Sequence, residues 1–137
     1  MAVLDPAVAE FLGGPHVASL ATVRPNGRPH VTPVWYQFDG HEFILSTLRD
    51  AQKVRNITWK GYASLAIHTA GAPFQHVVAE GPARVGSPLD NVWRERLAIR
   101  YLGEPAGRAY VRESGDWDVV AIHIRPVKWS TQGFETS

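Results

Sequence analysis

Cysteine is absent from the 137-residue sequence. Its absence excludes disulfide bonds, thiolate catalysis and cysteine-ligated metal sites, and it agrees with a reducing compartment, so we expect a cytoplasmic protein. Long apolar runs are also missing, because no stretch of about 18 apolar residues occurs and the chain does not open with a basic segment followed by an apolar one. The sequence therefore predicts neither a membrane span nor a secretory signal peptide.

The sequence also lacks a large excess of either positive or negative charge. Lysine and arginine total 14 and aspartate and glutamate total 13, so no global electric field would attract nucleic acid or an anionic membrane. The five tryptophans are scattered and form no stripe on which bases could stack. We predict no nucleic-acid or membrane partner, and any anion-binding site must be local.

The spacings typical of common catalytic and metal sites are missing as well. The six histidines show no close ligand spacing, and neither Gly-x-Gly-x-x-Gly nor Gly-x-Ser-x-Gly occurs. We therefore predict no metal, and the catalytic residues remain unknown.

What the sequence does contain is a series of strand-like runs. Turn residues at Pro25-Asn26-Gly27 and Asp39-Gly40 join the first three runs into a meander. Asp5 and Pro6 are typical of a helix start, and Asp90 caps a second predicted helix whose stripe is Val92, Trp93, Leu97 and Tyr101. The six strand-like runs span residues 16–24, 28–38, 42–47, 63–67, 75–85 and 118–128, and short helices are predicted at 52–57 and 108–112.

This order of elements predicts a mainly β protein. Alternating βαβ units are missing and the links are short, which favours a closed or nearly closed antiparallel barrel with a few short peripheral helices. The length suits a single domain over residues 1–137, of which residues 131–137 are expected to be a loose polar tail.

Anion-binding groups gather directly after the predicted strand at 42–47. Lys53, Arg55 and Asn56 lie where this strand leads into a short helix, and an ammonium, a guanidinium and free helix N–H groups are the donors that phosphate oxygens accept. This concentration points to a phosphorylated ligand. The alternative is a basic helix end that faces water.

Four blocks of sequence carry a resemblance to a known family. They are ASLAT at 18–22, NGRPHVTPVW at 26–35, KVRNI at 53–57 and VAEGPA at 78–83. Together they resemble the pyridoxamine 5′-phosphate oxidase-like split-barrel superfamily over roughly residues 10–128, and the chain looks most like its bacterial deazaflavin-dependent branch. The resemblance implies a six-stranded antiparallel split β-barrel, the FMN-binding split barrel. It also implies a homodimer that binds coenzyme F420, or alternatively FMN, between its subunits.

The resemblance also implies where the cofactor would lie. Lys53, Arg55 and Asn56 would hold the coenzyme phosphate, with Ser46 and Thr47 from the preceding strand. The ring would lie beside the strand that contains the cofactor-binding positions Pro33, Val34 and Trp35.

Four further residues have alternative interpretations. Trp129 would lie near the partner's ring pocket, or pack in the interface. Trp35 and Tyr36 point to opposite faces of their strand, so that one is expected in the core while the other walls a pocket. Gly81 is predicted to permit a bulge or the close approach of another backbone.

Three functions follow from the resemblance. The first is an F420-dependent oxidoreductase that transfers a hydride between reduced deazaflavin and a small organic acceptor. The second is an FMN-dependent oxidase or reductase of the pyridoxamine phosphate oxidase type. The third is a non-catalytic carrier that binds coenzyme F420. The sequence departs from the family at Ala51 and Gln52, where relatives often carry a basic residue that Arg49 could replace.

Overall fold

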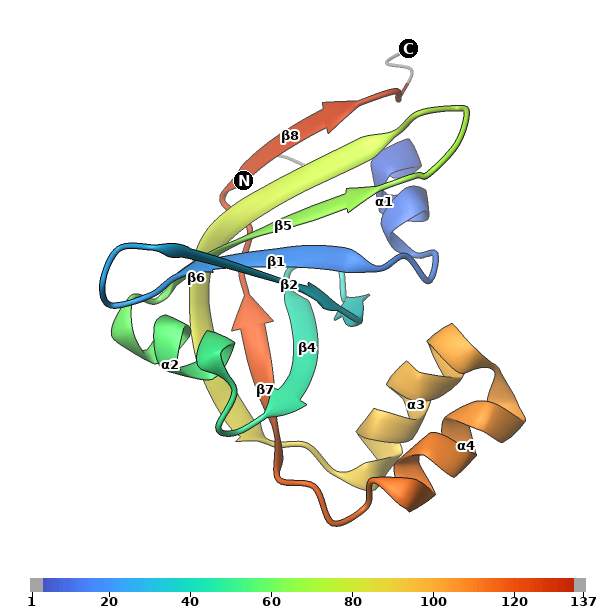
Figure 1. Cartoon of the computed structure of the whole chain (residues 1–137). Helices are drawn as coiled ribbons and strands as arrows, with labels where there is room; N and C mark the ends of the chain where they lie inside the picture. Colours follow the sequence, from blue (N-terminus) through green and yellow to red (C-terminus); the bar gives the residue numbers. More distant parts are fainter. Residues whose placement is uncertain (1–3, 135–137) are drawn as a thin grey trace.

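The computed structural model describes residues 4–134, which form eight strands and four helices (Figure 1). In chain order these are α1 (Pro6–Leu12), β1 (Ala18–Val23), β2 (Pro29–Val34), β3 (Tyr36–Phe38), β4 (Phe43–Leu48), α2 (Gln52–Trp59), β5 (Tyr62–His68), β6 (His76–Pro88), α3 (Asn91–Leu102), α4 (Glu104–Glu113), β7 (Val119–Ile124) and β8 (Lys128–Gln132). No helix within residues 4–134 is long and apolar enough to cross a membrane.

The strands form one curled antiparallel sheet in the order β2-β1-β5-β6-β7-β4-β3, and β8 also pairs with β6. The 13-residue strand β6 joins the two halves of the sheet, because its first part pairs with β5 and β8 while its last part pairs with β7. A register shift between Val85 and Pro88 marks an irregularity near its end. The predicted mainly β split barrel is thereby confirmed.

Two of the six predicted runs do not form single strands over their predicted ranges. The run predicted at 28–38 is interrupted at Trp35, so it forms β2 and β3 in the two halves of the sheet. The run predicted at 118–128 ends at Ile124, and the chain then forms β8, so the predicted tail at 131–137 was wrong for its first two residues. Residues 135–137 of that tail lie outside the described residues. The six strand-like runs therefore become eight strands.

The reason that β8 was missed is its environment. Its burial pattern shows one partly buried residue, Trp129, among exposed ones, so no apolar alternation marks it in the sequence. Its pairing with residues 76–80 of β6 satisfies a sheet edge that local sequence cannot reveal.

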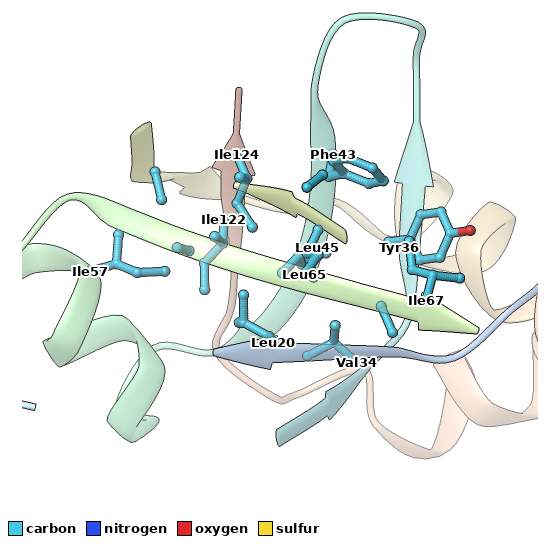
Figure 2. Packing of buried hydrophobic residues seen from close by; sticks show 14 of the residues in the cluster. Leu20, Val34, Tyr36, Phe43, Leu45, Ile57, Leu65, Ile67, Ile122 and Ile124 are labelled. Carbon is cyan, nitrogen blue, oxygen red and sulfur yellow. The ribbon is translucent and has the colours of Figure 1, made fainter. Parts of the chain in front are cut away.

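The core lies inside the curl of the sheet. Figure 2 shows side chains from the strands and from α2 pointing into one cluster. Leu20, Leu65 and Ile67 from one half of the sheet and Leu45 and Ile122 from the other are completely buried. Alternate residues of β1, β4 and β5 are buried, as is typical of strands with one face against the core.

The helix ends follow the predicted signals. The Asp5 side chain accepts a hydrogen bond from the Ala7 N–H at 2.8 Å, and Asp90 accepts one from the Trp93 N–H at 2.8 Å. Gly103 ends α3 with φ +84°, a conformation that favours glycine, and α4 starts at once. The second short helix was predicted at 108–112 and is longer, at Glu104–Glu113.

One part of the predicted α3 stripe was wrong. Leu97 is buried, but Val92 is 62% exposed. The helix instead fixes its position through Arg100, whose guanidinium donates to the carbonyl oxygens of Gly13 at 2.7 Å and Gly14 at 2.6 Å. These bonds attach α3 to the C-terminal end of α1.

Candidate cofactor and substrate cavity

A cavity of about 300 Å³ lies between β4, β7, the start of α2 and the α3–α4 hairpin. Figure 1 shows α2 and the α3–α4 hairpin on opposite sides of β4 and β7. A neighbouring hollow of about 450 Å³ extends along β2. The two hollows share Trp35, Ser46, Lys53 and Tyr110, so they form one continuous candidate site.

Lys53 is the central cation of this site. Its side chain is half-buried, and Nζ donates a hydrogen bond to Thr32 Oγ1 at the long distance of 3.3 Å. Burial lowers the pKa of the Lys53 ammonium below its ordinary value, because desolvation disfavours the charged form. Lys53 takes part in none of the ion pairs found within residues 4–134. A half-buried ammonium without a carboxylate partner is well suited to an anionic ligand.

Hydroxyl groups and a helix start lie beside this ammonium. Ser46 and Thr47, at the end of β4, line the same cavity as Lys53, and so does Ala51 at the N-cap of α2. The Ala51 side chain cannot cap the helix, which leaves its first N–H groups for another acceptor. The structure thus brings together three of the predicted phosphate ligands, Lys53, Ser46 and Thr47.

Arg55 lies at the edge of this arrangement. It is exposed, and its guanidinium donates to the Asp50 carbonyl oxygen at 2.6 Å and to Gln52 Oε1 at 2.7 Å. The side chain therefore folds over the start of α2 and is not among the residues that line either hollow.

Asn56 points in a third direction, into the protein. It is completely buried, its Nδ2 donates to Thr22 Oγ1 at 3.0 Å, and its Oδ1 accepts from Gln52 Nε2 at 2.7 Å. An α-helix turns by about 100° per residue, so residues 53 and 55 are about 200° apart and the three predicted ligands cannot share one face. In this conformation Asn56 holds α2 against β1.

We expect Asn56→Ala to lower the free energy of unfolding by about 1–2 kcal/mol, because the Thr22 hydroxyl would lose its buried amide partner. Urea unfolding of the protein without ligand measures this change. Thr58→Ala, an exposed substitution on the same helix, is the matched control. Equal stability of Asn56→Ala and wild type would show that the amide does not support the fold.

The aromatic pair at 35–36 separates as predicted. Tyr36 is completely buried and donates from its hydroxyl to the Leu12 carbonyl oxygen at 2.9 Å. Trp35 lines the cavity and stacks on Tyr101 with 4.8 Å between ring centroids and 5° between planes. A planar aromatic wall therefore faces the site next to Lys53.

The remaining predicted cofactor contacts are Pro33, Val34 and Trp129. Pro33 and Val34 line the hollow along β2, and the proline fits this position because β2 lies at the end of the strand order. Trp129 lies on β8, lines neither hollow, and packs against Phe38 and Phe43 at 6.0 Å between ring centroids. Its expected place near a partner's ring pocket stays a prediction.

The charged and aromatic cavity residues that were missed from the sequence are Arg94, Tyr110 and Trp117. They come from α3, α4 and the segment before β7. Arg94 is one of several arginines in this region and carries no local mark that distinguishes it. Only the position of the hairpin beside β4 brings these residues to the site.

Comparisons with known proteins agree with this architecture. A family model described as "Pyridoxamine 5'-phosphate oxidase" matches residues 4–133. A solved structure named "F420 Reductase" is 26% identical with a TM-score of 0.76, covering 93% of this chain and 98% of that one. A conserved hypothetical protein from Mycobacterium tuberculosis is 23% identical with a TM-score of 0.75, covering 98% and 91% of the two chains. The heme storage protein HutZ from Vibrio cholerae is 18% identical with a TM-score of 0.72, covering 97% of each chain. At these identities the last two show the fold alone.

Proposed function

The chain belongs to the pyridoxamine 5′-phosphate oxidase family, and on this premise we propose that it is an oxidoreductase that uses coenzyme F420 to transfer a hydride to a small organic acceptor. The observation that carries the proposal is the half-buried Lys53 ammonium, which faces a cavity beside two hydroxyls and a helix start. The similarity of the fold to a structure named F420 reductase, at 26% identity, supports the choice of deazaflavin.

The residues of the cavity fit a phosphate and a planar ring. Lys53 would supply the charge and Ser46 and Thr47 the hydroxyl donors for the phosphate, while Arg55 at the rim could reach an anionic tail. Pro33 and Val34 line the adjoining hollow, where a ring would lie along β2.

The chain's own contribution to catalysis would then be positioning. When bound, the deazaflavin supplies the hydride, and the hard chemistry belongs to it. Lys53 and the β4 hydroxyls would fix the phosphate, so that the ring is held in one orientation relative to the acceptor. Trp35 and Tyr110, which line both hollows, would exclude water from the reacting faces.

Two alternatives remain open at this site. FMN carries a phosphate and a ring of the same kind, and the family model is named after pyridoxamine 5′-phosphate oxidase. A non-catalytic carrier of coenzyme F420 is favoured by a different observation: in the described part of the chain, neither a histidine nor a carboxylate lines the two hollows. The proton donor of a reductase is therefore unassigned.

We further propose that two copies of the chain form a homodimer that completes the cofactor groove. Val31 lies on the edge strand β2 and is 61% exposed, and Val17 directly precedes the neighbouring strand β1 and is 53% exposed. A partner would cover both side chains. Sedimentation of the protein with bound coenzyme should give twice the mass of the chain. A monomer that still binds the coenzyme would contradict this proposal.

A comparative titration tests the cofactor. We expect the purified protein to bind coenzyme F420 with micromolar affinity and more tightly than FMN or haem, measured by absorbance and fluorescence. A yellow chromophore that copurifies, or tighter binding of FMN, would assign the site to flavin instead. Hydride transfer from reduced F420 to candidate acceptors then separates a reductase from a carrier.

A further inference from the structure

The α3–α4 hairpin brings a second cation to the cavity. Arg94 lies on α3, is only 6% exposed, and lines the cavity of which Lys53 forms another part. Burying a guanidinium is costly unless it is paired and hydrogen-bonded. The position of Arg94 therefore calls for an explanation.

The hydrogen bonds of Arg94 within the described residues go to neutral acceptors. Its Nη2 donates to Ser114 Oγ at 2.6 Å, and its Nη1 donates to the Ser114 carbonyl oxygen at 3.1 Å and, weakly, to Asn91 Oδ1 at 3.4 Å. A guanidinium has five N–H donors, so these bonds use only some of them. None of the ion pairs found within residues 4–134 includes Arg94.

The two helices of the hairpin that carries Arg94 pack closely against each other. A Cβ atom added at Gly107 of α4 would lie 2.6 Å from the Ile99 nitrogen of α3, so the two helices are in backbone contact. Ser114 follows α4 directly, and its hydroxyl oxygen accepts a hydrogen bond from the Arg94 guanidinium on α3. The bonds to Ser114 hold the Arg94 side chain in place at the cavity.

The walls around Arg94 are aromatic and aliphatic. Tyr110 and Trp117 contact each other edge-on, with centroids 6.2 Å apart, and both line the cavity together with Leu97 and Trp35. No acidic residue is among the cavity's lining, all of which lies in the described part of the chain. The site therefore combines flat apolar walls with two unneutralised cations.

We propose that Arg94 binds the carboxylate of the acceptor, and that the acceptor is a planar, conjugated organic acid held between Trp35, Tyr110 and Trp117. A carboxylate can accept hydrogen bonds from the guanidinium N–H groups that Ser114 and Asn91 do not use, and a conjugated body matches the aromatic walls. Lys53 remains for the phosphate of the coenzyme, so that the two cations hold two different molecules. The role of acceptor rests on the proposed function, whereas the carboxylate site rests on Arg94 and its surroundings.

Binding of cinnamate, a planar conjugated acid, compared with its uncharged methyl ester tests this proposal by calorimetry. The wild-type protein should bind cinnamate at least tenfold more tightly than methyl cinnamate. Arg94→Gln should raise the Kd for cinnamate about tenfold and leave the Kd for the ester unchanged, which removes the preference. Arg96→Gln, which removes an exposed arginine from the same helix, should behave as wild type.

Two more variants separate binding from structure. Ser114→Ala removes the hydrogen bond between Arg94 Nη2 and Ser114 Oγ but keeps the guanidinium. This variant should therefore retain most of the preference for the acid. If Ser114→Ala lost the preference as fully as Arg94→Gln, Arg94 would act only by holding the hairpin together. If Lys53→Gln removed the preference and Arg94→Gln did not, the carboxylate would belong to Lys53. Equal affinity of the wild type for acid and ester, or no measurable binding of either, would also overturn the proposal.

Coenzyme titrations keep this result distinct from the proposed function. Arg94→Gln should bind coenzyme F420 as the wild type does, and a loss of coenzyme affinity in this variant would assign Arg94 to the coenzyme and overturn the proposal. If the wild type bound no coenzyme but bound cinnamate through Arg94, the proposed oxidoreductase would fail and the carboxylate site would stand.

Discussion

Lys53→Ala should weaken binding of the coenzyme by about 1.5–3 kcal/mol, which is the scale of a charge-assisted hydrogen bond to phosphate. The effect should be large because Lys53 is the cation that lines both hollows. Titration of wild type and variant with the coenzyme at low and moderate salt measures it. Lys60→Ala, which removes an exposed lysine at the end of the same helix, is the matched control. Identical titration curves for Lys53→Ala and wild type would contradict the phosphate site.

The pH dependence of binding gives a second test of the same residue. Burial lowers the pKa of Lys53 in the free protein, so the ammonium loses its proton at a lower pH than an exposed lysine does. Coenzyme affinity should therefore fall as the pH rises through this lowered pKa, and Lys53→Ala should lack that step. An affinity that does not change with pH across this range would show that the ammonium is not a ligand.

The same shift predicts a stability cost. The pKa of Lys53 is lower in the folded protein than the ordinary value of 10.5 that it has in the unfolded chain. Burying the charged ammonium therefore lowers the free energy of unfolding at neutral pH. This cost is lost as the pH rises from the folded pKa to above 10.5, because the lysine is then neutral in both states. Without ligand, Lys53→Ala should therefore be no less stable than the wild type near pH 7. The bound coenzyme should stabilise the wild type more than Lys53→Ala, because the variant binds it less tightly.

Gly81→Ala should lower the free energy of unfolding by about 2–4 kcal/mol, at the upper end of overpacking effects. A Cβ atom at this position would lie 1.9 Å from the Arg125 carbonyl oxygen and 3.0 Å from the Val127 nitrogen. Both contacts are with backbone atoms, so no side-chain rotation can relieve them. Urea unfolding, followed by circular dichroism, measures the change.

The backbone around Gly81 has little freedom to move away. The Val127 N–H donates to the Glu80 carbonyl oxygen at 2.8 Å, and the Arg125 N–H donates to the Pro82 carbonyl oxygen at 2.9 Å. These bonds hold the link between β7 and β8 across β6. Gly71→Ala is the matched control, because an added Cβ atom there would meet nothing within 4 Å. Equal stabilities of the two variants would refute the close backbone contact at Gly81.

Much of the fold could be predicted because its signals are local. Asp5 with Pro6 and Asp90 mark helix starts through their own side chains and ring geometry. The turn residues at Pro25-Asn26-Gly27 and Asp39-Gly40 mark the connections between the first strands through their own backbone preferences. The expectation at Gly81 was confirmed for a similar reason, since a glycine within a strand is typical of close backbone contact.

Less of the candidate site could be predicted. Ser46, Thr47 and Lys53 lie near each other because only three residues separate β4 from α2, so chain connectivity alone brings them together. Asn56 belongs to the same short run, yet it is buried against Thr22, because the turn of the helix and the position of β1 decide which face is inside. Sequence proximity therefore predicted which residues gather at the candidate cavity, but not the direction of each side chain.

The sequence by itself determined the family and the mainly β class, and it predicted the candidate anion site after β4, because these depend on residue types and on contacts between neighbours in the chain. Only the tertiary structure decided that Arg94 and Trp117 line the same cavity as Lys53 and that β8 covers an edge of β6. Residues 53 and 94 are far apart in sequence, and they line one cavity because of where the α3–α4 hairpin packs. No local signal carries that information, since it results from the packing of the whole chain.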